Sequence, residues 1–458
     1  MRTESILKKL GIEPLNKESL QILAASLKTI LEYADSIESL ANWNAPILPN
    51  LNKLNSIELK FIESETQKTN LSIEECQIKV QKLIPQEKRK KFAAYYTIQQ
   101  GTKLMASIAK EFLRQRKGEV VLADPFLGSG STLTTAIKKI GAKKVQKVWG
   151  VEPLSLPALV AYASLLHVMK GKKDAIIVMV GDAFEEISKL SSPFVQSELL
   201  KADIILTNPP FTRWKYLEKK HRERLLSIIE KLGYRKYITR REVSLQTLSM
   251  FLCDQILKNN GLLISVLPAS TFYTIYGRGY KSLLREKYAI YAIVECKSRA
   301  SFSEDSGFKE VIIVAGKNSN KRSTAFIEIN NNVEEVAKII MNNIKPCTAI
   351  DLHALPRFLD INWLALFGKG ELRNIVVSIF EQGLRKRTLG YWENVLGKGS
   401  IIRGVEMYGP EFFFIPNKYW KIVAEERNFM KIRNENKELT INKEFLVKTL
   451  RKPSIYSQ

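Results

Sequence analysis

Asn208, Pro209, Pro210 and Phe211 carry the most specific chemical signal in the sequence, directly after the apolar run 203–207. Two adjacent prolines fix the backbone and remove two N–H donors, so the carbonyl groups around them become acceptors in a rigid frame. The amide oxygen of Asn208 and the carbonyl of Pro209 could accept both N–H groups of an aromatic amine, while Phe211 offers its ring a flat apolar face. We therefore expect these four residues to bind and orient an aromatic amine.

A glycine-rich turn follows an earlier apolar run and contains Asp124, Phe126, Gly128 and Gly130. The two glycines allow the backbone to turn sharply and to approach a ligand closely, and the helix expected after them presents unpaired amide groups. No Gly-Lys-Ser/Thr sequence follows, so the turn is not a phosphate loop. It predicts a nucleotide-type pocket.

Two acidic residues follow the next two apolar runs. Glu152 lies 152 − 128 = 24 residues beyond Gly128, where dinucleotide-binding folds place the carboxylate that holds ribose hydroxyls. Asp182 could accept from the amino group of an adenine, with Phe184 covering the ring. Taken alone, Glu152 would be better interpreted as a surface residue before a helix, and Asp182 is equally consistent with a helix cap. Together with the glycine turn they favour a nucleotide site.

The elements that would position these residues alternate between short apolar runs and helical patterns from about residue 118 to 316, which predicts a parallel sheet with crossover helices. Seven strands are expected, at Glu119–Ala123, Val148–Glu152, Ala175–Val180, Asp203–Thr207, Leu262–Leu267, Ile290–Val294 and Val311–Ala315. They fit one doubly wound α/β domain. Such sheets bind ligands outside the carboxyl ends of their strands, where all the residues named above lie.

Two further domains are expected around this one. Residues 1–90 read as helical, because apolar residues recur every three or four positions from Leu20 to Leu40, the pattern of one helix face. Residues 321–458 lose the strand–helix alternation and are expected to form a separate α+β domain. The central domain is therefore expected at 91–320.

The chain has 458 residues, and 71 Lys and Arg against 47 Asp and Glu give it a net charge of +24. Such an excess favours an anionic partner, either nucleic acid or a membrane surface, although a merely lysine-rich surface is an alternative. No apolar run approaches the ~18 residues of a membrane span, and no signal peptide is apparent at the start, so we expect a cytoplasmic protein. The four cysteines and three histidines show no metal-ligand spacing, and no metal is expected.

Four short motifs follow one another in the sequence: Asp-Pro-Phe-Leu-Gly-Ser-Gly, Gly-Val-Glu-Pro, Gly-Asp-Ala-Phe and Thr-Asn-Pro-Pro-Phe. Their order resembles that of the S-adenosylmethionine-dependent amino-methyltransferases of DNA, especially the adenine-N6 group. The resemblance covers roughly residues 90 to 316 and implies a Rossmann-like sheet. The segment with Tyr95, Tyr96 and Thr97 resembles the element that closes over the methionine end of the cofactor, although Ile98 stands where a proline often follows.

This resemblance implies a role for each strand end. Asp124, Phe126, Gly128 and Gly130 would line the methionine part of the S-adenosyl-L-methionine pocket, Glu152 the ribose, and Asp182 with Phe184 the adenine. Asn208, Pro209, Pro210 and Phe211 would form the catalytic element. The target base would have to be flipped out of double-stranded DNA to reach them.

A basic segment follows the catalytic element directly. Residues 212–241 hold eleven Lys and Arg against three Glu, a balance of 11 − 3 = +8, interleaved with aromatic residues. We expect it to grip DNA phosphates, although an amphipathic surface helix is an alternative reading. The expected DNA contacts are Arg213, Trp214, Lys215, Lys219, Lys220, Arg222, Arg235, Lys236, Arg240 and Arg241, with Arg385, Lys386 and Arg387 in the C-terminal region, the expected target-recognition domain.

Other functions are also consistent with the sequence. A methyltransferase for RNA or for a protein glutamine would share the Asn-Pro-Pro-aromatic element. A non-catalytic DNA-binding subunit would also have a large positive net charge. Asp35 with Glu58, Leu59 and Lys60 also faintly resembles a nuclease metal site. The sequence favours an adenine-N6 DNA methyltransferase of a restriction-modification system, with a specificity or restriction subunit as a further partner and no membrane.

Overall fold

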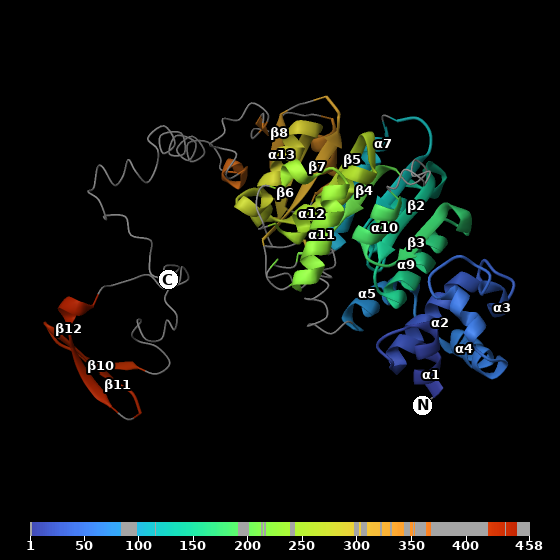
Figure 1. Ribbon diagram of the computed structural model, residues 1–458, viewed down its shortest axis with the longest axis horizontal. Helices are drawn as coiled ribbons and strands as arrows, with labels where there is room; N and C mark the ends of the chain where they lie inside the picture. Colours follow the sequence, from blue (N-terminus) through green and yellow to red (C-terminus); the bar gives the residue numbers. More distant parts are fainter. Residues whose placement is uncertain are drawn as a thin grey trace. The chain divides into compact units, whose positions relative to one another are not determined.

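The computed structural model forms two compact units, Met1–Gln382 and Gly383–Gln458, whose elements are drawn in Figure 1. It describes residues 2–83, 99–114, 116–190, 201–211, 214, 217–238, 243–296, 302–303, 309–320, 323–329, 332–342, 349–350, 352, 363–367, 420–435 and 437–446. None of the helices within these ranges is long and apolar enough to cross a membrane.

A nine-stranded sheet in the order β3-β2-β1-β4-β5-β7-β6-β8-β9 organises the first unit. Its strands are β1 (Val120–Asp124), β2 (Val145–Glu152), β3 (Ile176–Val180), β4 (Ala202–Thr207), β5 (Leu257–Pro268), β6 (Tyr288–Cys296), β7 (Glu310–Lys317), β8 (Thr324–Ile329) and β9 (Ala349–Ile350). The first five strands pair in parallel. The large, mostly parallel sheet is therefore confirmed, and β7 lies antiparallel between β5 and β6.

The expected count of seven strands is too low. All seven expected strands form, and β8 and β9 extend the sheet beyond β6. β8 pairs in parallel with β6, and its residues Ala325, Phe326 and Ile329 are buried. Both strands start after residue 320, beyond the part of the sequence in which strand and helix patterns were expected to alternate. β9 has only two residues, too few to give a pattern.

Hydrophobic layers cover both faces of the sheet, because successive side chains of a strand point to opposite faces. Along β1, Val120 and Leu122 pack into one layer and Val121 and Ala123 into the other. The first layer is covered by α7 (Gln99–Arg114), α8 (Ser131–Ile140), α9 (Ser155–Val168) and α14 (Val333–Met341). The second is covered by α10 (Ala183–Leu190), α11 (Lys219–Lys231), α12 (Leu245–Ile256) and α13 (Arg278–Lys287).

The N-terminal helices belong to the same compact unit as the sheet. They are α1 (Arg2–Leu10), α2 (Lys17–Leu31), α3 (Ile37–Leu40), α4 (Ser56–Lys68) and α5 (Ile73–Leu83). α2 and α5 pack on α9, and their apolar side chains continue the first layer. The apolar pattern expected on one helix face is divided between α2 and α3, because Ser36 caps a new helix start with its side chain.

The described part of the second unit contains a three-stranded antiparallel sheet of β10 (Lys421–Glu425), β11 (Phe429–Arg433) and β12 (Glu438–Asn442). Only Ile432 among its apolar residues is fully buried, while Phe429 and Leu439 are more than two-fifths exposed. The expected contacts Arg385, Lys386 and Arg387 lie outside the described residues.

Candidate active site

Asp124 ends β1 and connects it to the end of β4. Its Oδ1 accepts from the hydroxyl of Thr207, the last residue of β4, at 2.7 Å, and from the backbone N–H of Phe126 at 3.0 Å. The carboxyl group is almost completely buried at 2 % exposure. Burial raises its pKa to about 7, although both hydrogen bonds lower it. Without a bound ligand, the ionised form of Asp124 is therefore disfavoured.

Glu152 ends the neighbouring strand β2 and holds the glycine turn. Its Oε2 accepts from the N–H of Gly128 and its Oε1 from the N–H of Leu154, both at 3.0 Å. Burial raises the pKa of Glu152 to about 7, and the nearby carboxylate of Asp124 raises it further. Two buried carboxyl groups thus lie near each other at adjacent strand ends, a setting that favours a cationic ligand.

The glycine turn requires glycine at both of its key positions. Gly128 and Gly130 have φ of 58° and 76°, values that residues with a side chain rarely adopt. A Cβ at Gly130 would also lie 3.0 Å from the Cβ of Ala161, so this residue lets the turn pack closely on α9. α8 then begins at Ser131, with its first amide groups near the strand ends.

Asp182 and Phe184 lie where β3 passes into α10. Oδ1 of Asp182 accepts from the N–H of Phe184 at 2.8 Å, as a capping residue does. The Phe184 ring lies 6.4 Å from the Phe126 ring, with 56° between their planes. Asp182 is half-buried. The structure thus brings together the expected turn, ribose and adenine residues at one edge of the sheet.

The Asn-Pro-Pro-Phe element begins directly after β4. Nδ2 of Asn208 donates to the hydroxyl of Ser303 at 3.0 Å, and that hydroxyl donates to Oε2 of Glu310 at 2.9 Å. This chain of hydrogen bonds orients the amide group of Asn208. Phe211 is 4 % exposed and belongs to the first hydrophobic layer, so stacking on a base would require its ring to become accessible.

Ser303 and Gln77 were not found from the sequence, and neither was the contact of Thr207 with Asp124. Gln77, on α5, donates from Nε2 to the carbonyl of Ser129 at 2.9 Å, and Gln81 donates to the hydroxyl of the same serine at 3.1 Å. The glycine turn is therefore held from the N-terminal helices as well as from β2. No local pattern marks these residues, because each meets its partner through the fold.

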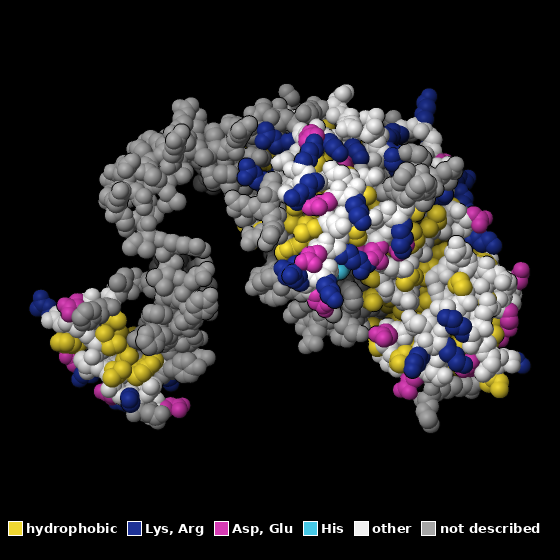
Figure 2. All heavy atoms as spheres, viewed as in Figure 1, with side chains coloured by type: hydrophobic (Ala, Val, Ile, Leu, Met, Phe, Trp, Pro, Cys, Tyr) yellow, Lys and Arg dark blue, Asp and Glu magenta, His cyan; other side chains and the backbone are white. Residues whose placement is uncertain are grey.

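The basic segment forms the amphipathic helix α11 in its described part. Leu225 and Ile229 are buried, and Figure 2 shows several Lys and Arg side chains over the face that carries α11 and α13. Lys219 and Lys220 are exposed, and Arg222 and Trp214 are partly buried. Arg235 and Lys236 form ion pairs with Glu230 at 2.7 Å and Glu286 at 2.6 Å.

Some expected site residues fall outside the part of the chain that the structure describes. They are Tyr95, Tyr96 and Thr97 of the methionine-end segment, and Arg213, Lys215, Arg240 and Arg241 of the basic segment.

The faint nuclease reading is not supported at Glu58. This residue closes a capping box at the start of α4, because its Oε2 accepts from the N–H of Asn55 at 2.9 Å. It also forms an ion pair with Lys9 at 2.7 Å. Among the residues that the structure describes, no group of three or more His, Cys, Asp or Glu side chains is arranged to hold a metal ion.

The sheet order and the residues at its strand ends define an α/β domain of the methyltransferase type. Residues 80–349 match the family model described as N-6 DNA Methylase, more than half of the chain. The protein therefore belongs to the N-6 DNA methylase family, and the resemblance seen in the motifs is confirmed. The sequence matches no curated protein sequence.

Several solved structures share the fold. The type IIG restriction endonuclease BpuSI is 14% identical, with a TM-score of 0.56 over 77% of this chain and 44% of that one. The DrdV–DNA complex is 14% identical, with a TM-score of 0.52 over 81% and 43%. A nuclease-deletion mutant of the type ISP restriction-modification enzyme LlaGI, in complex with a DNA substrate mimic, is 14% identical, with a TM-score of 0.51 over 76% and 39%. The chain spans less than half of each of these proteins.

Proposed function

We propose that the protein transfers a methyl group from S-adenosyl-L-methionine to the N6 amino group of adenine in DNA. The observation that carries this proposal is the position of Asn208. Asn208 comes directly after Thr207, the last residue of β4, whose hydroxyl donates a hydrogen bond to Asp124. Ser303 orients the side-chain amide of Asn208. An acceptor for an amino group therefore lies beside the buried carboxylates that fit a cationic cofactor.

The residues at the strand ends fit this cofactor by charge. Asp124 and Glu152 have pKa values raised to about 7 because burial disfavours their charged forms, and a cation nearby would favour ionisation again. S-Adenosylmethionine supplies a methyl group on a positively charged sulfur. Phe184 would cover its adenine ring, and Glu152 has carboxylate lone pairs beyond its two hydrogen bonds to backbone N–H groups for ribose hydroxyls.

The catalytic task of the chain is orientation. The lone pair of the adenine amino group is delocalised into the ring, so the nitrogen is a poor nucleophile. Acceptance of both N–H groups, by the amide oxygen of Asn208 and the carbonyl of Pro209, would favour a tetrahedral nitrogen whose lone pair points at the methyl group. The nucleophile is neutral, so no general base is required before transfer.

The substrate we propose is a base flipped out of duplex DNA, at a cost of a few kcal/mol. Exposed cations of α11, Lys219 and Lys220 among them, would hold the phosphates near the site. Similar folds occur in restriction-modification enzymes, one of them bound to a DNA substrate mimic. We infer that this chain is the modification part of such a system, with a specificity or restriction subunit as partner.

The test is methyl transfer from labelled S-adenosylmethionine to unmethylated duplex DNA, with structured RNA and protein as parallel substrates, followed by mass spectrometry of the nucleosides. We expect N6-methyldeoxyadenosine. Asn208→Ala should lower turnover by about 10²–10³-fold, the usual effect of losing one transition-state hydrogen bond, with cofactor affinity unchanged. Phe211→Ala should weaken turnover and leave residual activity. Asn259→Ala, at an exposed position of β5, serves as the matched control.

Three outcomes would contradict the proposal. Label in RNA or protein but not in DNA would assign a different substrate class. Absence of cofactor binding would make the chain a non-catalytic subunit. Full activity of Asn208→Ala would remove this residue from the catalytic element.

A further inference from the structure

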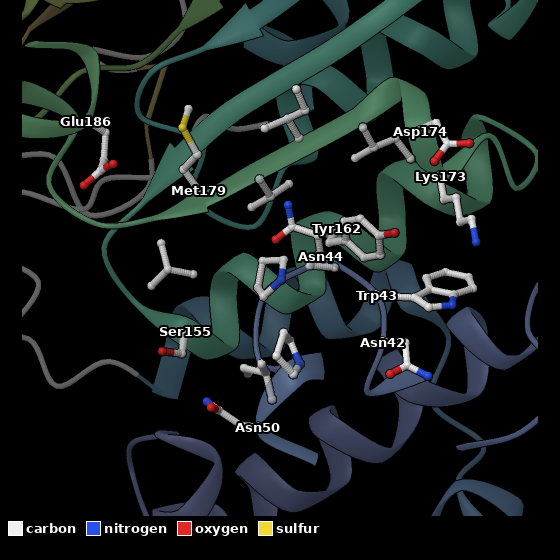
Figure 3. A pocket seen from close by; sticks show the side chains of 18 residues that line it. Asn42, Trp43, Asn44, Asn50, Ser155, Tyr162, Lys173, Asp174, Met179 and Glu186 are labelled. Carbon is white, nitrogen blue, oxygen red and sulfur yellow. The ribbon is translucent and has the colours of Figure 1, made fainter. Parts of the chain in front are cut away.

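A groove of about 870 Å³ lies along the edge strand β3 and reaches its carboxyl end at Val180, but none of the candidate active site residues lines it. One wall is formed by all five residues of β3, Ile176–Val180, and the other by the loop 42–50 between α3 and α4. Figure 3 shows Tyr162 of α9 and Asn44 of the loop facing into it. Nothing in the proposed methyl transfer uses this groove.

The groove follows the backbone edge of β3. Successive side chains of a strand point to opposite faces, yet every residue from Ile176 to Val180 lines the groove. Among the described strands, β3 pairs only with β2. Alternate residues of such an edge strand present their N–H and C=O groups away from the sheet. These groups can therefore form a ladder with an added strand.

The two edges of the sheet differ in how they are protected. β9 ends the other side with two residues, and very short edge strands resist further pairing. β3 has five apolar residues, Ile-Ile-Val-Met-Val, with no charge or proline among them, and Val180 is 43 % exposed. Natural sheets usually carry a blocking residue at such an edge. Its absence from β3 leaves the backbone groups that face the groove open to pairing.

The polar and charged residues that line the groove favour a peptide over a nucleic acid as its ligand. Asn42 and Asn44 are exposed on the wall formed by the loop, and their amide groups can donate to and accept from a peptide backbone. The charged lining residues are Lys173, Asp174 and Glu186, one cation and two carboxylates, which disfavour a nucleic acid strand. Because the loop forms a second wall, the groove admits one strand rather than the sheet of a second copy.

We propose that an extended peptide segment of a partner protein binds in this groove as an additional strand beside β3. At ~3.3 Å per residue, the five residues of β3 offer about 16 Å of ladder. Backbone hydrogen bonds supply affinity, and alternate side chains of the peptide enter the apolar lining. The two carboxylates favour a segment with neutral or basic side chains over an acidic one.

The test uses the full chain and a phage-displayed library of linear peptides, whose enriched members are synthesised and measured by fluorescence polarisation. Val180→Lys places a charge at the strand edge, and Asn44→Trp fills the groove from the other wall. Each should weaken peptide binding about tenfold or more. Leu15→Lys is the matched control, because Leu15 is 39 % exposed and does not line the groove. Amide exchange should slow at alternate residues of β3 when peptide is added.

Several results would overturn the proposal. They are a library that yields no binder, binders that bind Val180→Lys and the wild type equally, and exchange that is unchanged along β3. Competition by a single-stranded oligonucleotide would identify the groove as a nucleic acid site instead. A dimer in sedimentation that Val180→Lys dissociates would assign the edge to a second copy of this chain.

Discussion

Asp254 of α12 and the carboxylates at the strand ends are both buried, yet their pKa values move in opposite directions. Asp254 is 1 % exposed. It accepts from Tyr234 and Tyr288, at 2.6 and 2.8 Å, and from Lys287 at 3.0 Å, and pairs with Lys317 at 3.2 Å. Burial raises its pKa, but Lys317 first, and then the other three groups, bring it below the ordinary value.

Asp124 and Glu152 receive only hydroxyl and backbone N–H donors. Within the described ranges no Lys or Arg lowers the pKa of either residue, and burial raises both pKa values to about 7. Asp254 thus has its positive partners within the fold, whereas the strand-end pair has none in the described part of the chain, as our proposal of a cationic ligand requires. Buried carboxyl groups in these two regions therefore differ in what surrounds them.

The largest expected effect is on stability, from Asp254→Asn. The change leaves Lys317, whose side chain is 13 % exposed, and Lys287 without their shared counter-charge. Breaking a buried ion pair in this way costs about 3–5 kcal/mol of unfolding free energy, measurable by urea denaturation. Asp35→Asn, at an exposed position, should change it by less than ~0.5 kcal/mol. If Asp254→Asn lowered the unfolding free energy by less than about 1 kcal/mol, Asp254 would not differ from the strand-end carboxylates in its role in stability.

The same substitution at the strand end, Asp124→Asn, should affect cofactor binding and leave stability almost unchanged. In Asp124→Asn the amide oxygen can keep both bonds that Oδ1 accepts, from Thr207 and Phe126, so the unfolding free energy should be unchanged or slightly raised. Loss of the buried negative charge should weaken S-adenosylmethionine binding by about 2 kcal/mol or more, roughly 30-fold by calorimetry. Unchanged affinity with lost stability would show that Asp124 is structural.

The pH dependence of stability and of cofactor binding should reveal the raised pKa values of the strand-end pair. Because burial raises the pKa values of Asp124 and Glu152 to about 7 from ordinary values of 3.8 and 4.5, the folded chain holds protons that the unfolded chain releases between about pH 4 and 7. Their contribution to the unfolding free energy therefore falls as pH rises across this window. S-Adenosylmethionine should bind more tightly at pH 8 than at pH 6.

S-Adenosylhomocysteine is the matched control for this pH effect, because its sulfur carries no charge. It should show a smaller change in affinity between pH 6 and pH 8. Equal pH dependence for both compounds would show that the carboxylates do not respond to the sulfonium.

The smallest effect is expected from Gln77→Ala, which removes one support of the glycine turn. Loss of this hydrogen bond should cost about 1 kcal/mol of cofactor binding, seen as a higher KM for S-adenosylmethionine with unchanged kcat. Ile78→Ala, at an exposed position on the same helix, is the control. A fall in kcat with unchanged KM would count against a positioning role.

The sequence predicted the sheet well because its strands are buried apolar runs, and all seven expected strands form. It predicted the strand-end residues because parallel strands bring their carboxyl ends to one edge. It could not predict β9, which has two residues. Nor could it predict the partners of Asn208, Asp124 and Ser129, because these contacts join residues 95, 83 and 52 positions apart.

The strand order β5-β7-β6 has a consequence for how activity arises during synthesis of the chain. β7 fills the place between two strands that precede it in sequence, and Glu310, which holds Ser303 against Asn208, is its first residue. During synthesis β1 to β4 are complete before Glu310 has been added. A chain that ends before β7 would thus contain the carboxylates of Asp124 and Glu152 but would lack the support that orients Asn208.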